Sequence, residues 1–284
     1  MLPAIALCIG QGTVFHVARI LHFRIKGVLS GYAEGVCPHS APGADRVQED
    51  AMHIAGQLNW INELPAPARD AIRNRFVYRD LEPGETIKES GQPAEGMYQV
   101  QSGYIKLLAD RPDGEQSLLL IYIRGNSFGE STLIARRPHH HTTIAASPAR
   151  IGFLKQNDFD ELYRTYPSIP EALCRKFATA LSSMIAYREK QNETTVAQRV
   201  ALVLRNLAEM SETPQIGGRR AIDIPITIGE LSSFLGLTRQ TVQKEISLLK
   251  RRNLISKSQG AWTVLDMALL RTLAPAEDVP DLLT

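Results

Sequence analysis

The sequence predicts an α+β fold, in which a β-rich segment is followed by a long helix and a small mixed unit. Between residues 76 and 160, short apolar runs alternate with turn clusters about every 8–12 residues, which is typical of a small barrel or sandwich. After residue 169 the apolar residues recur with helical spacing instead. The chain of 284 residues is long enough for two domains with cores of their own.

The composition is that of an ordinary globular protein, with 44% hydrophobic and 22% charged residues. The net charge of +2 is too small to identify a partner, so any basic surface must be local. Cys8, Cys37 and Cys174 lie far apart and are odd in number, which indicates neither a disulfide framework nor a zinc ribbon. We therefore expect a reduced, cytoplasmic protein that does not associate with membranes.

Residues 1–51 are predicted to form a disordered extension. The apolar stretch Leu2–Leu21 lacks a basic start and is interrupted by polar residues, so it is a poor signal peptide and a poor membrane span. From Gly27 to Asp50 the sequence shows no period. Met52 is a candidate natural initiator, and a functional N-terminal arm is the alternative interpretation.

The predicted barrel domain covers residues 52–167 and includes an N-terminal helix before the strands. Its strand signals are the runs 97–100, 104–108 and 117–123. Turn clusters such as Pro112-Asp113-Gly114 and Arg124-Gly125-Asn126 separate or follow them.

The predicted dimerisation helix covers residues 168–195. From Ile169 to Thr195 no Gly occurs and no Pro follows Pro170, which favours one continuous helix. One strip recurs at alternating steps of four and three residues, as in a coiled-coil seam. The predicted dimer-interface residues of this strip are Leu173, Phe177, Ala180, Met184, Tyr187 and Gln191. A second apolar strip contains Leu181, Ile185 and Ala186, so one strip can face the barrel and the other a partner chain. The alternative is a helix packed only on its own barrel.

Residues 196–284 are predicted to form a winged helix-turn-helix domain. Thr227-Ile228-Gly229-Glu230 is a capping-box pattern at the start of a short helix. Gly236 permits the positive φ of a tight turn, and Thr238 begins a second helix. The predicted buried stripe of that second helix consists of Val242, Ile246 and Leu249. The apolar runs 254–256 and 262–265 flank a polar turn and predict a two-stranded wing.

The polar face of the second helix predicts DNA binding. Arginine can bind a guanine edge and glutamine an adenine edge in the major groove, so these residue types suit base reading. The predicted DNA-binding residues are Thr227, Thr238, Arg239, Gln240, Thr241, Gln243, Lys244 and Lys257. Residues 227–257 contain six basic and two acidic residues, a local excess larger than that of the whole chain. The alternative is an ordinary helical hairpin with a solvated face. The succession of cap, turn, paired stripes, polar face and wing favours DNA binding over it.

With barrel, long helix and winged helix in this order, residues 58–274 resemble the Crp/Fnr family of bacterial transcription regulators. The motifs are Gly91, Met97-Tyr98, Ser102-Gly103-Tyr104-Ile105, Gly125-Asn126-Ser127-Phe128-Gly129-Glu130, Gln198-Arg199-Val200-Ala201, Leu235-Gly236-Leu237-Thr238-Arg239-Gln240-Thr241-Val242 and Leu254-Ile255. The resemblance implies a cyclic-nucleotide-binding-like β-barrel, that is a double-stranded β-helix or jelly roll, as the sensor domain. It also implies a homodimer on a two-fold symmetric DNA site, and contact with RNA polymerase if the protein is an activator.

The resemblance also defines candidate residues for an effector pocket. They are Gly129, Glu130, Ser131, His140, His141, Thr142, Met184 and Ile185. In members that bind cyclic nucleotides, a Gly-Glu pair cradles the phosphate and holds the ribose, and an arginine about ten residues later neutralises the phosphate. Here that arginine position falls within His139–His141, and Met184 and Ile185 are apolar where those members offer hydroxyls. Histidine is mostly neutral at pH 7 and lacks the guanidinium fork, which argues against a cyclic nucleotide.

Other cofactors are not expected. Three dispersed cysteines cannot supply the ligands of an iron–sulfur cluster. Neighbouring side chains of the run His139–His141 point in different directions, which argues against a metal site. The barrel then either senses an unidentified small molecule or serves as an effector-independent scaffold.

Within the recognition helix, Gln240 stands where the family commonly has Glu, and Lys244 where it commonly has Arg. We therefore expect a DNA site different from the common cyclic-AMP-regulator site. The second hypothesis is a cyclic-nucleotide-binding signalling module that acts through protein contacts. An enzyme is not expected, because the sequence has no nucleophile elbow, P-loop, dinucleotide fingerprint or zinc-protease motif.

Overall fold

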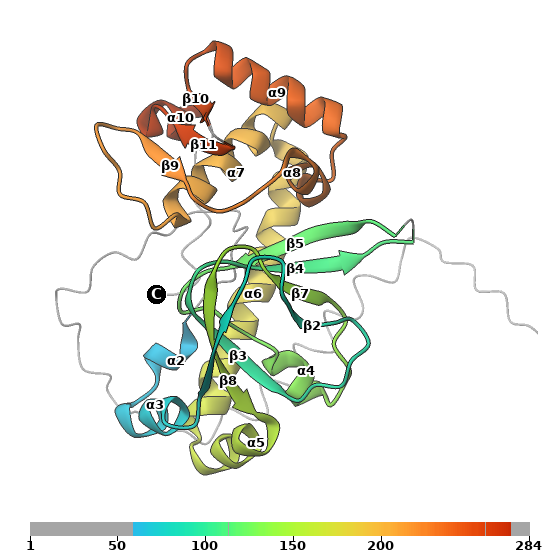
Figure 1. Cartoon of the computed structure of the whole chain (residues 1–284), viewed down its shortest axis with the longest axis vertical. Helices are drawn as coiled ribbons and strands as arrows, with labels where there is room; N and C mark the ends of the chain where they lie inside the picture. Colours follow the sequence, from blue (N-terminus) through green and yellow to red (C-terminus); the bar gives the residue numbers. More distant parts are fainter. Residues whose placement is uncertain (1–58, 113, 259, 274–284) are drawn as a thin grey trace, which may run out of the picture. The chain divides into compact units, whose positions relative to one another are not determined.

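The barrel is preceded by two short helices, α2 (Trp60–Glu63) and α3 (Ala66–Arg73). The structure is a computed structural model that describes residues 59–112, 114–258 and 260–273 (Figure 1). The predicted extension 1–51 and the candidate initiator Met52 lie outside the described residues.

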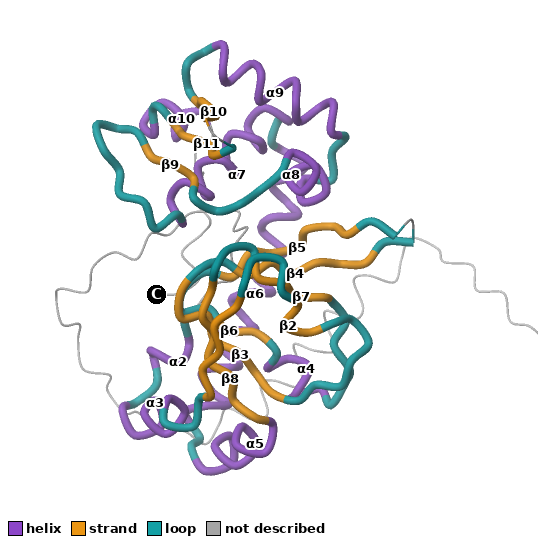
Figure 2. The backbone as a smooth tube through the Cα atoms, viewed as in Figure 1, coloured by secondary structure: helices purple, strands orange, loops and turns teal. Residues whose placement is uncertain are grey.

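The β-rich segment forms two facing antiparallel sheets with strand orders β1-β8-β3-β6 and β2-β7-β4-β5 (Figure 2). The strands are β1 (Val77–Leu81), β2 (Thr86–Lys88), β3 (Gly96–Ser102), β4 (Ile105–Asp110), β5 (Gln116–Tyr122), β6 (Ser127–Phe128), β7 (Thr142–Ala145) and β8 (Ala149–Lys155). This pairing is that of a jelly roll, which confirms the predicted barrel. Helix α4 (Glu130–Ala135) interrupts the strands between β6 and β7. The core between the sheets consists of Leu81, Val100, Ile105, Phe128, Ala145, Ala149 and Ile151.

Helices cover one side of the barrel and build a second core there. These are α2, α3, α5 (Gln156–Thr165) and the first turns of α6 (Ser168–Glu193). Trp60, Met97, Leu154 and Leu162 are buried in this core, together with Leu173 of α6. The long helix is therefore anchored by its N-terminal part on the barrel of its own chain.

The C-terminal segment is a winged-helix unit in which four helices pack with a three-stranded sheet. Its elements are α7 (Val196–Met210), β9 (Arg220–Ile222), α8 (Ile228–Leu235), α9 (Arg239–Arg251), β10 (Ile255–Ser258), β11 (Ala261–Val264) and α10 (Met267–Leu273). The predicted wing is the β10–β11 hairpin, and β9 pairs with β11 as an edge strand that sequence analysis did not predict.

A third apolar cluster joins the barrel to the C-terminal segment. Leu108, Leu118 and Ile121 on the outer face of β4 and β5 belong to the same buried cluster as Val203 and Leu231 of α7 and α8. The two segments therefore share buried apolar surface, and α8 is the helix that meets β5.

Within the residues that the structure describes, no helix has the length and apolar character needed to cross a membrane.

Candidate DNA-binding surface and effector site

The helix-turn-helix is fixed by two local caps and a glycine turn. Thr227 Oγ1 accepts a hydrogen bond from the Glu230 amide at 3.1 Å, and Glu230 Oε2 accepts one from the Thr227 amide at 2.8 Å. This is the predicted capping box, which satisfies two amides at the start of α8. Gly236 ends α8 with φ +63°, and Thr238 Oγ1 then accepts from the Thr241 amide at 3.1 Å to begin α9. The two caps and the glycine turn between them set the orientation of α9 relative to α8.

Helix α9 buries one face and exposes the other. Val242, Ile246 and Leu249 are buried, as the periodicity predicted. The predicted reading residues Arg239, Gln240, Gln243 and Lys244 are all exposed. An exposed row of long polar side chains on the first turns of the second helix is the arrangement that reads base edges in helix-turn-helix proteins.

Positive charge gathers around the wing. Lys250 Nζ at the end of α9 lies 5.1 Å from the centre of the Trp262 ring, and Lys257 Nζ of β10 lies 4.7 Å from it. Both ammonium groups thus meet the π-face of one ring. Lys257, a predicted DNA-binding residue, and Lys250 are therefore brought together at the wing.

Arg239, one of the predicted reading residues, lies close to a carboxylate of the barrel. Its guanidinium lies 3.7 Å from the carboxylate of Glu115, a residue of the turn that connects β4 and β5. Both side chains are more than half exposed. An exposed pair of this kind contributes about 0–1 kcal/mol. The contact is therefore weak enough for DNA phosphates or bases to replace it.

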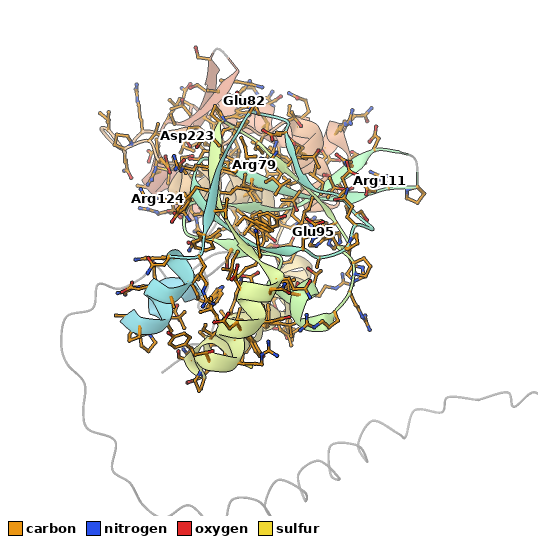
Figure 3. The ribbon with its side chains drawn as sticks, turned by 60° about the horizontal axis from the view of Figure 1, so that its bottom comes forward. Arg79, Glu82, Glu95, Arg111, Arg124 and Asp223 are labelled. Carbon is orange, nitrogen blue, oxygen red and sulfur yellow. The ribbon has the colours of Figure 1, made fainter. Side chains whose placement is uncertain are left out.

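Stronger polar contacts tie α8, and the stretch of chain just before it, to the barrel. Lys106 Nζ of β4 donates to Glu230 Oε1, while the other carboxylate oxygen of Glu230 completes the cap of α8. Tyr104 donates its hydroxyl hydrogen to Asp223, which is labelled in Figure 3, and the Ser233 hydroxyl accepts from the Leu118 amide at 3.1 Å.

In the barrel, the predicted effector residue Glu130 is buried and already engaged. Its Oε1 accepts from Trp60 Nε1 at 3.0 Å and from Lys176 Nζ at 2.9 Å. Burial raises the pKa of Glu130, but the charge of Lys176 and the hydrogen bonds from Ser127 and Lys176 outweigh this, so the pKa is lowered overall. A ribose hydroxyl would have to compete with these internal donors for the carboxylate.

The other predicted effector residues do not form one polar pocket. Gly129 begins α4 with φ +100°, and Thr142 Oγ1 is buried where it accepts from the Ser90 amide. Ser131 and His140 are exposed, and His141 is half-buried. Met184 and Ile185 lie on an exposed part of α6. No arginine is among these residues, so the set fits a cyclic nucleotide poorly.

Two buried titratable residues of this region, Lys88 and His139, are not among the predicted effector residues. Sequence analysis named His139 only within the run His139–His141 and did not single out Lys88. Burial lowers the pKa of Lys88 to about 8, although the charge of Glu130 opposes this. Burial and the charge of Lys88 lower the pKa of His139 to about 4. Nothing in the stretch Thr86-Ile87-Lys88-Glu89 signals a buried lysine, since an alternating strand with polar residues usually exposes them.

The predicted dimer seam needs one correction. Leu173 is 1% exposed in the core of its own chain and Phe177 packs against that core, so Leu173 cannot contact a partner. The Tyr187 ring lies 6.5 Å from Phe234 of α8, and the side chain of Gln191 lies outside the described parts. Ala180 and Met184 remain exposed. Together with Leu181 and Ile185 of the second strip, Met184 forms an exposed apolar patch on α6, each residue more than half exposed.

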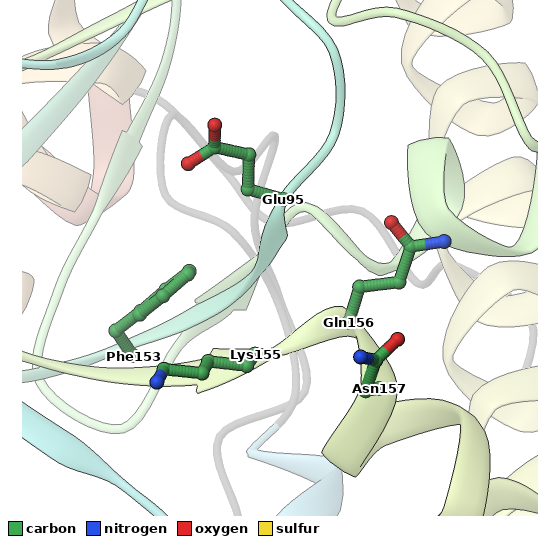
Figure 4. A pocket seen from close by; sticks show the side chains of 5 residues that line it. All are labelled: Glu95, Phe153, Lys155, Gln156 and Asn157. Carbon is green, nitrogen blue, oxygen red and sulfur yellow. The ribbon is translucent and has the colours of Figure 1, made fainter.

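A separate pocket of about 280 Å³ lies where β3 and β8 meet the start of α5 (Figure 4). Its lining residues are Glu95, Phe153, Lys155, Gln156 and Asn157. None of them is among the predicted effector residues. Within the described part of the chain, no group of three or more His, Cys, Asp or Glu side chains is placed to hold a metal ion.

Comparison with known proteins gives a consistent assignment of both segments. Residues 78–166 match the family described as cyclic nucleotide-binding domain, and residues 198–273 match the Crp-like helix-turn-helix domain. The cAMP-activated global transcriptional regulator CRP of Pasteurella multocida is 28% identical over 172 residues, which are 60% of this chain and 81% of that protein. The transcriptional activator protein FnrL of Cereibacter sphaeroides is 23% identical over 72% of this chain and 82% of its own length.

Solved structures show the same fold. A transcriptional regulator of the CRP/FNR family from Thermus thermophilus, TTHA1359, superposes with a TM-score of 0.57 at 25% identity. The match covers 71% of this chain and all of that one.

Proposed function

Because the chain belongs to the Crp/Fnr family of DNA-binding transcription regulators, we propose that it acts in the cytoplasm as a homodimer on a two-fold symmetric DNA site. The observation that carries the proposal is the exposed polar face of α9, presented behind a capped helix and a glycine turn. RNA polymerase is a further partner if the protein activates transcription.

Each predicted DNA-binding residue has a chemical role in this proposal. Arg239 reads guanine through its planar fork of donors, and Gln240 and Gln243 read adenine edges. Lys244 reads a base edge beside them. Lys257 contacts phosphate, as do Thr227, Thr238 and Thr241 at the two caps. Because Gln240 cannot accept from cytosine as a carboxylate does, a selection from random DNA should return a site other than the common cyclic-AMP-regulator site.

The base-reading role is tested by two alanine variants. Arg239→Ala should weaken binding to the selected site by about 1–3 kcal/mol and leave random DNA nearly unaffected. Lys257→Ala should weaken both and reduce the salt slope of binding by about one unit. Fluorescence anisotropy titrations over a range of salt concentrations measure both effects. Equal losses on selected and random DNA for Arg239→Ala would contradict base reading.

The proposed dimer interface is the exposed apolar patch of α6. Leu181, Met184 and Ile185 are 60%, 69% and 54% exposed, which is unusual for three neighbouring apolar side chains on one helix. A second copy of α6 would bury them in a coiled coil.

Sedimentation equilibrium tests this interface. Met184→Glu should shift the protein to monomer at micromolar concentration, because the introduced carboxylate would be buried without a partner. Ile216→Glu is the matched control, since Ile216 is 73% exposed in a loop far along the chain from α6. If both variants sediment like the wild type, another surface forms the dimer.

The barrel is proposed to bind a small effector other than a cyclic nucleotide, or to act as a scaffold. The support is that Glu130 is engaged by Lys176 and Trp60 and that no arginine is among the predicted pocket residues. DNA binding measured without any additive, and then with cyclic AMP, tests this. Tighter binding on addition of cyclic AMP would contradict it.

A further inference from the structure

Lys88 is a buried cation without a counter-ion inside the barrel. It is 7% exposed, and its Nζ lies 3.5 Å from His139 Nδ1 and 5.8 Å from the centre of the Phe128 ring. No carboxylate of the described residues forms an ion pair with it. A buried charge that lacks a partner is costly, so its presence requires an explanation.

The other two lysines buried in this region are paired. Lys106, also 7% exposed, donates to Glu230, and Lys176 donates to Glu130 at 2.9 Å. Glu130 is the carboxylate near enough to Lys88 to affect its pKa, but its Oε1 receives Lys176 and Trp60. Lys106 and Lys176 therefore each have a carboxylate partner, and within the described residues Lys88 has none.

A hydroxyl without a partner lies beside Lys88. Thr143 of β7 is directly opposite Lys88 of β2 in the antiparallel register, so both side chains are on the same face of the sheet. Thr143 is fully buried, and its Oγ1 has no hydrogen-bond partner among the described atoms. Two unsatisfied polar groups thus meet on the inner face.

His139 lies beside Lys88. Its Nδ1 is 3.5 Å from Lys88 Nζ and 3.2 Å from Thr132 Oγ1, and Thr132 donates its own hydroxyl hydrogen to the Gly129 carbonyl oxygen. His139 Nδ1 therefore accepts at most one of the three ammonium hydrogens of Lys88, which leaves at least two for another acceptor. Lys88 and Thr143 together offer donors to one group that is rich in oxygen and negatively charged.

The inner face beside this cluster is not completely covered. Leu107 is the cross-strand neighbour of Thr143 on the next strand and pairs in turn with Leu120 of β5. Both leucines are only partly buried although their register places them on the same face as Thr143 and Lys88. The part of this face formed by the two leucines is therefore partly exposed, whereas Lys88 and Thr143 themselves are 7% and 0% exposed.

We propose that the barrel binds a small oxyanion, a carboxylate or phosphate group of an effector, between Lys88 and Thr143. The inference rests on the proposed sensor role of the barrel and specifies the chemistry of its ligand. Lys88 neutralises the anion, the Thr143 hydroxyl donates to it, and Phe128 forms the apolar wall behind the ammonium. A ribose is not part of the ligand, because Glu130 is held by Lys176 and Trp60.

Calorimetric titration of the full chain with sodium phosphate, and separately with sodium acetate, tests the proposal. Sodium chloride keeps the ionic strength constant at pH 7. We expect saturable binding of at least one of the two anions, at least tenfold weaker in Lys88→Met and several-fold weaker in Thr143→Val. The anion that binds more tightly, phosphate or acetate, identifies whether the effector group is a phosphate or a carboxylate. Absence of saturable binding by both anions, or equal binding by wild type and Lys88→Met, overturns the proposal.

Three further variants make the result specific. Lys106→Met removes a lysine of equal burial that already has a carboxylate partner, and should bind the anion like the wild type. Lys88→Arg keeps the charge and should retain binding, which decides the question if Lys88→Met does not fold. Cyclic AMP binding that depends on Glu130, shown by its loss in Glu130→Gln and its persistence in Lys88→Met, would also overturn the proposal. DNA affinity is measured separately, so failure of the anion site and failure of the proposed function are distinguishable.

Discussion

At the scale of single residues, the barrel interior is defined by how its charged side chains are neutralised. Glu130 and Lys176 neutralise each other, and the hydrogen bonds from Trp60 and Ser127 fix the carboxylate. Lys88 has only a neutral imidazole beside it. The charges of Glu130 and Lys176 thus compensate each other within the fold, whereas the uncompensated charge of Lys88 lowers the stability of the protein.

The pH dependence of stability follows from the lowered pKa of Lys88. Its pKa is about 8 in the folded protein, below the ordinary value of 10.5. Between these values the unfolded chain binds a proton that the folded chain does not, so the free energy of unfolding rises with pH in this window. Lys88→Met should therefore stabilise the protein by about 1–3 kcal/mol at pH 7, and the gain should disappear toward pH 10.

Urea denaturation of both proteins at pH 7 and pH 9.5 measures this difference. The groups that surround Lys88, namely His139, His141 and Glu130, are present in both proteins and cancel in the comparison. Lys106→Met should instead lose stability at pH 7, since it leaves Glu230 without its cation. A Lys88→Met variant less stable than wild type at pH 7 would contradict the argument.

At the scale of elements, the DNA-binding segment could be predicted more completely than the barrel. The Thr227 cap, the Gly236 turn, the stripe of α9 and the wing are each encoded by neighbouring residues, so a local pattern suffices. Strand β9 has only three residues, Arg220–Ile222, and is a strand only because it pairs with β11. Such pairing has no local signal.

The long helix shows the limit of periodicity. Leu173 follows the same heptad spacing as Met184, yet the first is in the core of its own chain and the second is exposed. Spacing shows that a face is apolar but not what covers it. For the same reason Lys88 could not be identified, because its burial depends on Phe128 and His139, which are distant in the sequence.

The turn between α8 and α9 gives a prediction at this scale. An added Cβ at Gly236 would meet no atom within 4 Å, so the cost of a substitution comes from the backbone φ of +63° alone. Gly236→Ala should lower the free energy of unfolding by about 1–2 kcal/mol. Gly236→Asn should cost less, because asparagine tolerates the left-handed region. Denaturant titration compares them, and equal costs for both variants would show that the φ value is not what matters.

At the scale of the whole molecule, the barrel and the DNA-binding segment depend on each other through a shared apolar cluster. Leu118 belongs to the barrel but is buried at 1% exposure in the cluster that contains the core of α7, α8 and α9. Lys106 and Tyr104 add polar contacts on the same face of the barrel. A ligand that shifts β4 or β5 is therefore positioned to affect α8.

Leu118→Ala tests this dependence. The variant should lose about 2–5 kcal/mol and raise amide hydrogen exchange in α8 as well as in β5. Ile151→Ala is the control, because Ile151 lies in a cluster made only of barrel residues and should raise exchange chiefly in the strands. Unchanged exchange of α8 in Leu118→Ala, measured by mass spectrometry, would show that the two segments open independently.

Glu230 divides its two carboxylate oxygens between two tasks, one oxygen capping α8 and the other receiving Lys106. This matters for the construction of hybrid regulators, in which the DNA-binding segment of one protein is fused to the sensor of another. A foreign barrel with an apolar residue at the position of Lys106 would leave one oxygen of Glu230 without its cation, although every residue of the transplanted segment is intact. A working hybrid should therefore carry over Lys106, and with it Tyr104 and Leu118, as part of the DNA-binding module.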